Sequence, residues 1–294
     1  MGRRRPPPGR HRPGPEGEAC PALSEYHRFV RILGRKVRYE DTGQGPTVLL
    51  LHGIGHSLRN WSRTVPGLVE AGFRAISIDM PGFGYSEPTP EVLDEAGTTA
   101  FLEAFLDTFY IDAVDLVGHS LGGAIATAFA LHRPTRVRRL ALVAAAVGPD
   151  VNPGLRLLTL RIGKSLVRPF ALRQVFGLIA SSWDEQVLEQ ELRDAGRWLS
   201  DPAQRLYFWN VLRAGLRVRG VRPERLLLER LPELKMPVLV AWGKEDQLLP
   251  VSNVERIRSR LPEARYELFE KAGHMLPYEV ADQFSSALID FLRS

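Results

Sequence analysis

Cysteine, lysine and long apolar runs are scarce in this chain of 294 residues. Cys20 is the single cysteine, so no internal disulfide bond can form; this agrees with a reducing compartment and predicts a cytoplasmic protein. No uninterrupted apolar run approaches the roughly 18 to 20 residues that a membrane-spanning helix needs. The longest runs are strand-sized, such as Val48–Leu51. These absences disfavour a disulfide-stabilised secreted domain and a helical membrane protein.

The net charge of +5 is concentrated in residues 1–22, which hold five arginines against two glutamates among prolines and glycines. A segment with so little to bury is expected to be a disordered tail. An export leader would need an apolar stretch after the arginines, and Pro6–Ala19 offers none. In the rest of the chain the two signs of charge are well mixed. We therefore expect no nucleic-acid partner.

Beyond the tail, short aliphatic runs alternate with helical patterns. Runs that are apolar on both faces are typical of buried parallel strands. They are Val48–Leu51, Ala75–Asp79, Val114–Val117 and Leu140–Val143, with expected helices at Leu58–Ala71, Thr98–Phe109 and Leu121–His132 and an expected pair of strands over Phe29–Asp41. The alternation predicts an α/β fold with a doubly wound, mostly parallel sheet that binds ligands at the carboxyl ends of its strands.

The alternation stops near Gly148 and resumes at Met236, where Pro237–Trp242 is the next expected strand. The intervening segment has a helical pattern rich in leucine and arginine, which predicts an inserted helical cap over residues 148–235. The core then comprises residues 23–147 and 236–294. Its last elements are expected at Ser252–Arg260, Arg265–Phe269 and Ala281–Leu292.

A glycine-flanked serine follows the strand Val114–Val117, in the motif Gly118-His119-Ser120-Leu121-Gly122-Gly123. This is a G-x-S-x-G elbow in its setting of strand, sharp turn and helix. A serine on so tight a turn is strained, and the glycines remove Cβ atoms that would clash. The turn lifts the hydroxyl off the sheet, to the positive end of the next helix. Ser120 is therefore the predicted nucleophile.

Serine is a poor nucleophile and needs a neighbouring base to take its proton. His274 lies five residues beyond Phe269, the last residue of an expected strand, in a loop short enough to hang over the carboxyl edge of the sheet. It also follows the nucleophile in the chain, as this architecture requires. His274 is therefore the predicted base.

A carboxylate that fixes the tautomer of this histidine completes the arrangement. Asp246 follows the strand Pro237–Trp242, which gives the order Ser, Asp, His. The adjacent Glu245 is expected to point away. Asp150, just after the preceding strand, is the weaker alternative.

The tetrahedral intermediate needs two backbone donors for its oxyanion. Leu121 N–H, directly after the nucleophile, is one. The other is expected from the loop His52-Gly53-Ile54-Gly55, where Ile54 N–H is our choice. We expect His52 itself to brace this loop through a hydrogen bond.

Together these motifs resemble the α/β-hydrolase superfamily, in its serine esterase and lipase-like branch with a helical cap. The resemblance runs from about Phe29 to the C-terminus, through Leu33–Val37, His52–Gly55, Asp79–Ser86, the Ser120 elbow, Gly243–Asp246 and Gly273-His274. It implies catalysis without metal or organic cofactor. In the branch's pattern Asp79 belongs to a structural loop. Dehalogenases and epoxide hydrolases carry aspartate at the elbow, and Ser120 argues against both.

The elbow sequence is similar to that of many lipases and esterases. We expect a medium-sized hydrophobic carboxylic ester or lactone as the small-molecule substrate, cleaved through an acyl-enzyme. Carbon–carbon bond hydrolysis and acyl transfer on the same triad are the alternatives; ring-cleavage hydrolases often have tryptophan after the histidine, where this chain has Met275. A ligand-binding protein that keeps the fold is the alternative outside enzymes.

The cap is expected to determine substrate specificity. Its segment Leu155–Arg168 is apolar with a basic residue every few positions. This favours an amphipathic helix packed on the core; a lid making weak contact with a membrane surface is the alternative. The cap's aromatic residues are expected to serve packing more than a pocket: Trp183, Trp198, Tyr207, Phe208 and Trp209.

Overall fold

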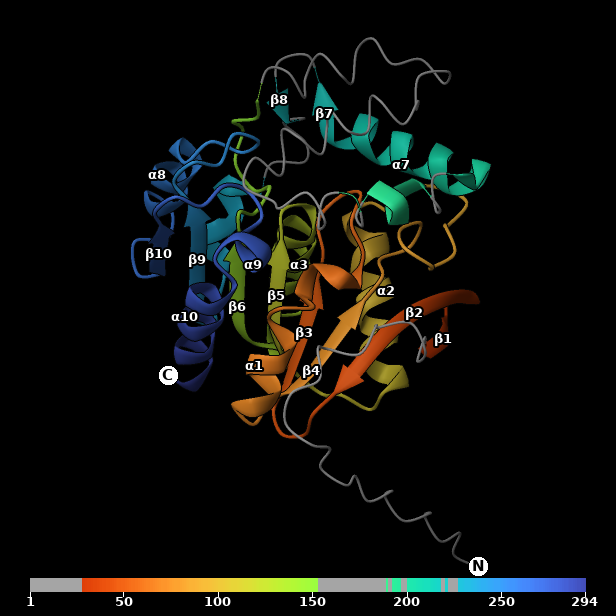
Figure 1. Ribbon diagram of the computed structural model, residues 1–294, viewed down its shortest axis with the longest axis horizontal. Helices are drawn as coiled ribbons and strands as arrows, with labels where there is room; N and C mark the ends of the chain where they lie inside the picture. Colours follow the sequence, from red (N-terminus) through yellow and green to blue (C-terminus); the bar gives the residue numbers. More distant parts are fainter. Residues whose placement is uncertain (1–27, 153–188, 190–191, 197–199, 218–219, 222–226) are drawn as a thin grey trace, which may run out of the picture.

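The computed structural model describes residues 28–152, 189, 192–196, 200–217, 220–221 and 227–294, whose main sheet of eight strands is flanked by helices (Figure 1). The strand order is β1-β2-β4-β3-β5-β6-β9-β10. Neighbouring strands are parallel except β1 with β2 and β2 with β4. The bounds are β1 (Arg28–Ile32), β2 (Arg35–Thr42), β3 (Thr47–Leu51), β4 (Arg74–Ile78), β5 (Val114–His119), β6 (Val137–Val143), β9 (Val238–Gly243) and β10 (Arg265–Phe269). The predicted α/β fold with a mostly parallel sheet is confirmed.

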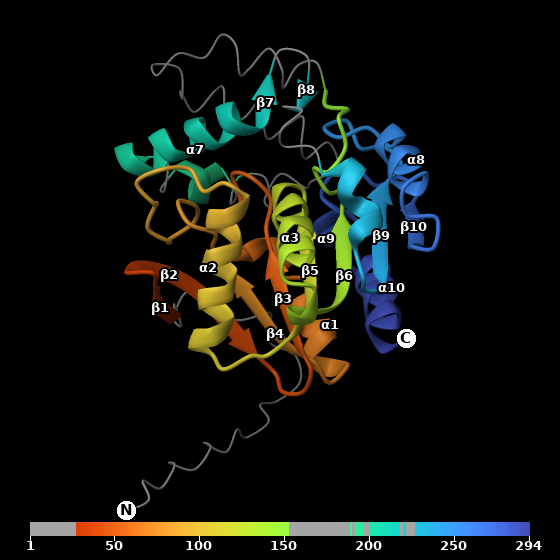
Figure 2. The ribbon, with the colours of Figure 1, turned by 180° about the vertical axis from the view of Figure 1, so that it is seen from behind.

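Each face of the sheet carries its own apolar core. One core includes Phe105 of α2, Phe129 of α3 and Ile257 of α8. The other includes Leu68 of α1 and Phe284 of α10. Figure 2 shows α2 and α3 in front of the sheet, on the face opposite to α1. The helices are η1 (Leu58–Trp61), α1 (Val65–Glu70), α2 (Glu95–Thr108), α3 (Leu121–His132), η2 (Pro134–Arg136), α7 (Pro202–Gly215), η4 (Leu228–Glu233), α8 (Ser252–Arg258), α9 (Leu276–Glu279) and α10 (Ala281–Arg293).

Most expected elements differ from the observed ones by a few residues at their ends. The single helix expected over Leu58–Ala71 is wrong, because the structure has the 3-10 turn η1 and then the short helix α1. Pro66 explains the break: proline has no backbone N–H to donate and fits only the first turn of a helix, where it stands in α1.

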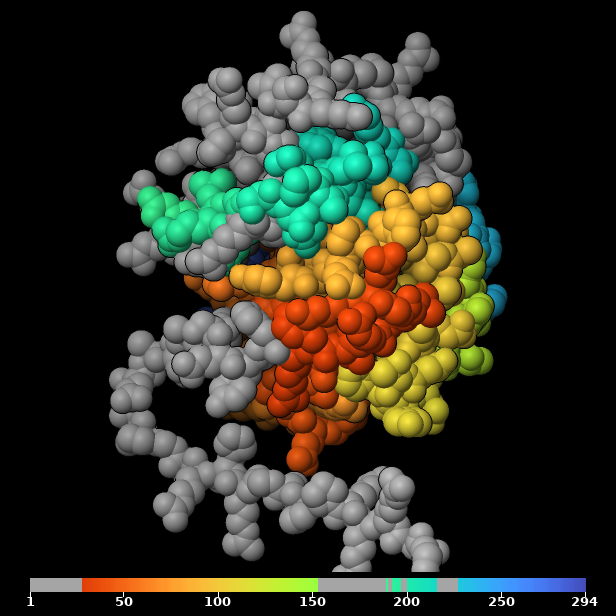
Figure 3. All heavy atoms as spheres, turned by 90° about the vertical axis from the view of Figure 1, so that its right-hand side faces the viewer, coloured from red at the N-terminus to blue at the C-terminus, as the bar shows by residue number. Residues whose placement is uncertain are grey.

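In the described part of residues 148–235, α7 passes above the carboxyl edge of the sheet (Figure 1), while η4 packs against α3 and α8 before β9 begins. Figure 3 shows α7 lying on the segment between β4 and α2. Gln204 Nε2 donates to the carbonyls of Gly84 and Ser86 at 3.2 and 3.1 Å. The Tyr207 ring fills the space beside Gly82, where an added Cβ would lie 2.1 Å from it. We call these contacts of Gln204 and Tyr207 the α7 clasp.

A short antiparallel pair, β7 (Leu216–Arg217) with β8 (Gly220–Val221), follows α7, and the helical pattern does not predict it. The expected tail over residues 1–22, the segment Leu155–Arg168, and both Trp183 and Trp198 lie outside the described residues. The limits of the cap therefore stay predictions. Among the helices that the structure describes, none has the length and apolar character needed to cross a membrane.

The chain reverses its direction of progress across the sheet at β3, which pairs with β4 on one side and with β5 on the other. At such a point the connections leave the carboxyl ends of the two strands in opposite directions, which opens a crevice for ligands. The loop that begins at His52 follows β3, and the elbow at Ser120 follows β5. The fold therefore brings these two loops to one crevice.

Candidate active site

Ser120 occupies a strained turn between β5 and α3. Its φ of 53° and ψ of −116° are rare for a residue other than glycine. Backbone hydrogen bonds hold it there, because its N–H donates to Val143 O and its carbonyl accepts from Ala146 N, both at 2.9 Å. An added Cβ on Gly122 would lie 2.4 Å from Leu51 O, so this position requires glycine. The surrounding structure thus fixes the strain at the serine.

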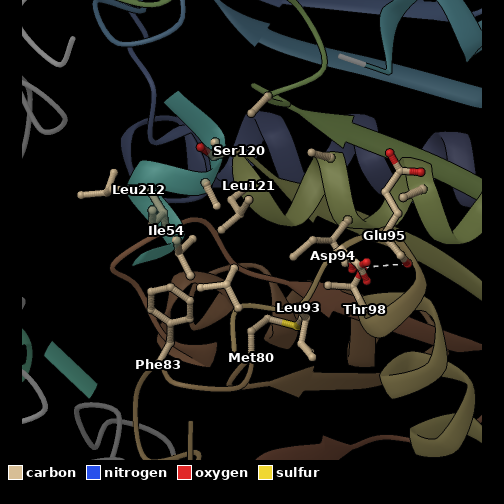
Figure 4. Close-up of a pocket in the computed structure, with 18 of the residues that line it drawn as sticks. Ile54, Met80, Phe83, Leu93, Asp94, Glu95, Thr98, Ser120, Leu121 and Leu212 are labelled. Atoms are coloured by element: carbon tan, nitrogen blue, oxygen red, sulfur yellow. Dashed lines mark hydrogen bonds between the residues drawn. The ribbon is translucent and has the colours of Figure 1, made fainter. Parts of the chain in front are cut away.

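Two backbone N–H groups accompany the Ser120 side chain. Leu121 is the first residue of α3, so its N–H has no partner within the helix. Neither this N–H nor that of Ile54 donates to another described residue. Ile54, Ser120 and Leu121 line one cavity, and Figure 4 shows them close together. The two predicted oxyanion donors are therefore on the same side of the cavity as the serine.

His274 and Asp246 form a buried pair. His274 Nδ1–H donates to Asp246 Oδ2 at 2.8 Å. The other carboxylate oxygen, Oδ1, accepts from the backbone N–H groups of Leu248 and Leu249, each at 2.8 Å. Because Nδ1 carries the hydrogen, Nε2 of neutral His274 is an acceptor. This Nε2 has no hydrogen-bond partner among the described residues, so it is available to take a proton.

The other acidic candidates have different surroundings. Glu245 is exposed, whereas the adjacent Asp246 is buried. Asp150 Oδ2 accepts from Ser252 Oγ at 2.9 Å and from Arg256 Nε at 3.0 Å, so α8 holds this carboxylate. Asp246 is the carboxylate that meets the histidine.

Glu279 of α9 was not found by sequence reasoning. Its carboxylate turns back onto the loop that carries His274, where it accepts from Gly273 N and, at 3.4 Å, from Met275 N. The two N–H groups belong to the residues on either side of His274, so Glu279 holds the loop at both flanks. The only sequence signal for the helix that carries Glu279 is Pro277, because proline is typical of the first turn of a helix.

Two further histidines are buried beside the site. His52 Nδ1–H donates to Gly53 O at 2.7 Å, and its Nε2 accepts from Met80 N at 2.9 Å, which is the bracing contact expected of His52. Burial lowers the pKa of His52 from 6.5 to about 4 and that of His56 to about 3. The cause is desolvation, because an imidazolium would lose its water here. Both rings are therefore neutral at pH 7.

Residues 46–280 match the family model described as alpha/beta hydrolase fold. The chain belongs to the α/β-hydrolase fold family. It is 33% identical over 269 residues to a 2-hydroxy-6-oxononadienedioate/2-hydroxy-6-oxononatrienedioate hydrolase of Paraburkholderia phymatum, covering 87% of this chain and 91% of that protein. The protein is accordingly a hydrolase of this family.

Two solved structures share the fold of this α/β hydrolase. One is a meta-cleavage product hydrolase from Pseudomonas fluorescens IP01, with a TM-score of 0.71 and 24% identity over 90% of this chain and 97% of that one. The other is a thermophilic esterase from Thermogutta terrifontis, with a TM-score of 0.75 and 23% identity over 90% of this chain and 98% of that one. Proteins with this fold thus include both a meta-cleavage product hydrolase and an esterase.

Asp79, in the loop that carries the family resemblance, has structural contacts. Its Oδ1 accepts from Leu58 N at 2.7 Å and its Oδ2 from Tyr85 N at 2.8 Å. The buried guanidinium of Arg38 lies 3.6 Å away. These contacts agree with a scaffold role. No group of three or more histidine, cysteine, aspartate or glutamate side chains within the described ranges is arranged to hold a metal ion.

A cavity of about 190 Å³ opens at Ser120 in this α/β hydrolase. Its described lining is mainly apolar and includes no lysine or arginine; it comes from the core and from α7, with Ile54, Met80, Phe83, Ile125, Leu212 and Leu248 among its members. Asp94, Glu95 and Thr98 lie at the end away from Ser120 (Figure 4). Tyr207, which we expected to serve packing, both forms the α7 clasp and lines this cavity.

Proposed function

We propose that this protein hydrolyses uncharged, hydrophobic carboxylic esters or lactones through an acyl-enzyme on Ser120. The observation that carries the proposal is the apolar cavity that opens at this serine without a basic side chain in its described lining. An acyl chain gains about 25 cal/mol for each Å² of apolar surface that it buries there. A carboxylate in the same place would lose its hydration without gaining a basic partner from the described lining.

The proposed reaction uses the groups of the site in turn. Ser120 Oγ attacks the carbonyl carbon while His274 Nε2 takes the hydroxyl proton, and Asp246 stabilises the imidazolium. The N–H groups of Ile54 and Leu121 donate to the oxyanion. The imidazolium then protonates the leaving alkoxide as the ester C–O bond breaks. Water attacks the acyl-enzyme by the same route, which releases the acid and restores the serine.

The far end of the cavity supports an uncharged substrate. Asp94 Oδ1 accepts from Gly97 N at 2.8 Å and so already caps the N-terminus of α2. Glu95 adds a second carboxylate, which pairs with Arg230 at 3.1 Å. A substrate carboxylate that reached this end would meet the like charge of Asp94, which forms no ion pair among the described residues.

Carbon–carbon bond hydrolysis is the second candidate, because the 33% identity to the Paraburkholderia protein favours it. The name of that protein denotes a dicarboxylate substrate. Two features weigh against it here: the acidic end of the cavity and Met275, which stands where ring-cleavage hydrolases often have tryptophan.

The test compares initial rates on p-nitrophenyl esters of increasing acyl length with rates on 2-hydroxy-6-oxononadienedioate. We expect turnover of a medium-length ester with a higher kcat/KM than that of the dienedioate. Ser120→Ala should lower kcat by about 10⁴-fold to 10⁶-fold, as loss of a nucleophile does. Ser259→Ala, at an exposed serine after α8, is the control and should keep the wild-type rate.

Two results would contradict the proposal. Turnover of the dienedioate without any ester would favour the second candidate. Equal ester rates in the wild type and Ser120→Ala would mean that another residue is the nucleophile.

A further inference from the structure

His119, the residue before Ser120, contacts the loops that surround the site. Its Nε2–H donates to the backbone carbonyl of His274 at 2.9 Å in a buried hydrogen bond. The two imidazole rings lie 4.8 Å apart between centroids, at 48° to each other. Its Nδ1 lies beside the loop His52–Gly55, which we call the oxyanion loop. An added Cβ on Gly53 of this loop would lie 3.0 Å from Nδ1. The side chain of His119, which belongs to the elbow, thus contacts both the oxyanion loop and the loop that carries His274, which we call the base loop.

The tautomer of His119 follows from its partner. A carbonyl oxygen can only accept, so Nε2 carries the hydrogen and Nδ1 is an unprotonated acceptor. Burial, as the largest cause, lowers the pKa of His119 well below 6.5. The ring therefore stays neutral and adds no second charge when His274 becomes an imidazolium.

The other nitrogen of His119 shows that packing alone does not explain this residue. Nδ1 is buried and has no hydrogen-bond partner among the described residues. Burying an acceptor without a partner destabilises the folded chain. A phenylalanine would fill a similar volume without this cost, so the value of the histidine lies in its Nε2–H.

Resting on the function proposed above, we propose that His119 is a positioning residue for the base. Its Nε2–H fixes the backbone of His274 relative to the elbow, so that His274 Nε2 meets the Ser120 hydroxyl. Asp246 orients the His274 ring, and Glu279 holds the neighbouring N–H groups, but neither is bonded to the elbow. Among the hydrogen bonds between described residues, that of His119 alone joins the elbow directly to the base loop.

The experiment separates the donor from the ring. His119→Phe keeps a ring and removes the donor, whereas His119→Gln keeps an amide N–H at a similar reach. Thr127→Ala is the stability control, because this buried hydroxyl of α3 donates to Gly123 O at 2.8 Å and contacts neither loop. For each protein we would measure kcat and KM on the best ester, the rate of Ser120 labelling by a p-nitrophenyl alkylphosphonate, and the thermal midpoint.

We expect His119→Phe to lower kcat by roughly tenfold to a hundredfold with little change in KM, since a misplaced base slows the chemical step. Phosphonate labelling should slow by a similar factor. His119→Gln should recover most of both rates. Thr127→Ala should lower the thermal midpoint and leave both rates near the wild type.

The inference is overturned if His119→Phe keeps the wild-type kcat, if the loss appears in KM alone, or if His119→Gln is as impaired as His119→Phe. Should His119→Phe not fold, His119→Asn replaces it, because the shorter amide cannot reach the His274 carbonyl. A wild type inert to both esters and phosphonate would contradict the proposed function instead, so the two failures are distinguishable.

Discussion

The two ends of β5 hold buried polar residues with opposite kinds of surroundings. At the amino end, Asp115 is 1% exposed and lies 2.8 Å from the guanidinium of Arg138 and 3.6 Å from that of Arg139. At the carboxyl end, Ser120 has a strained backbone, and His119 Nδ1 is buried without a hydrogen-bond partner in the described part of the chain. At the amino end two guanidinium groups offset the buried charge, although Asp115 Oδ1 accepts no hydrogen bond from the described residues. At the carboxyl end neither His119 nor Ser120 buries a charge, but the backbone is strained.

This difference indicates which end of β5 contributes to stability and which contributes to the reaction. Opposite charges at the amino end stabilise one another in the folded chain and have no further role in the site. Strained backbone conformations persist only where the surrounding structure fixes them, and they cluster at active sites. We therefore expect substitution of the paired charges at the amino end to affect mainly the free energy of unfolding, and substitution of the predicted triad at the carboxyl end to affect mainly kcat.

The largest effect should come from Asp246→Asn, at the carboxyl end. An asparagine holds the wrong tautomer of His274, and in a comparable triad such a change lowers kcat by about 10⁴-fold. Ester hydrolysis and the thermal midpoint would be measured together, and the midpoint should change little. Asp150→Asn is the matched control, because Asp150 is bonded to α8 instead, and it should stay within about twofold of the wild type. Comparable losses in both variants would contradict the role of Asp246.

Acid should destabilise the protein through the buried histidines in the loop that follows the carboxyl end of β3. The folded chain has a pKa of about 4 for His52 and about 3 for His56, against 6.5 for an ordinary histidine. The unfolded chain binds these protons first, so the free energy of unfolding falls as the pH drops from 6.5 towards 4 and then 3. For His52 the full loss is on the order of 3 kcal/mol.

Urea unfolding at a series of pH values measures this loss. His52→Gln removes one of the buried histidines whose pKa is lowered, which also include His56 and His119, and should flatten the pH dependence in this range, whatever its stability at neutral pH. A wild type that is equally stable near pH 7 and near pH 4 would show that these buried rings do not control its acid sensitivity.

A smaller effect is expected from Arg138→Ala, at the amino end. Arg138 donates to Asp115 at 2.8 Å and also to the carbonyls of Ala113 and Thr47. Its loss leaves Asp115 with the more distant Arg139, which should lower the free energy of unfolding by about 2 kcal/mol. Denaturant unfolding measures this change, and kcat/KM should stay within about twofold. A large fall in kcat/KM without destabilisation would remove the distinction between the two ends.

The smallest effect is expected from Asp94→Asn, at the end of the cavity away from Ser120. Asparagine keeps the cap of α2 and removes the charge. The measurement is the ratio of kcat/KM for an ester whose acyl chain ends in a carboxylate to that for its methyl ester. Because Asp94 is exposed, we expect this ratio to rise only about threefold. An unchanged ratio would mean that this carboxylate does not select against charged substrates.

The central strands and α3 could be predicted because their signals are local. Each buried strand is a short aliphatic run, and the glycines around Ser120 mark the turn without reference to the rest of the chain. Pro66 is also a local signal, and the helix expected over Leu58–Ala71 did not take it into account. The carboxyl edge of a parallel sheet then gathers the loops after its strands, which is why Asp246 and His274 could be proposed together.

Contacts between distant segments could not be predicted in this way. The hydrogen bond from His119 to the His274 carbonyl spans 155 positions of the chain. Glu279 acts on backbone N–H groups, which every residue except proline carries, so its partners have no sequence signature. The α7 clasp likewise depends on carbonyls of a loop far earlier in the chain. Such contacts are set by tertiary packing rather than by periodicity.

The α7 clasp limits how freely the segment above the cavity can be exchanged between relatives. Gln204 satisfies two carbonyls in the core loop, and Ser86 Oγ of that loop accepts from Arg38 N of β2 at 2.9 Å. A grafted segment without a glutamine here would leave the carbonyls of Gly84 and Ser86 without these donors, and Gly82 without the ring that packs on it. A chimaera should therefore inherit α7 and the loop Gly82–Ser86 from the same parent.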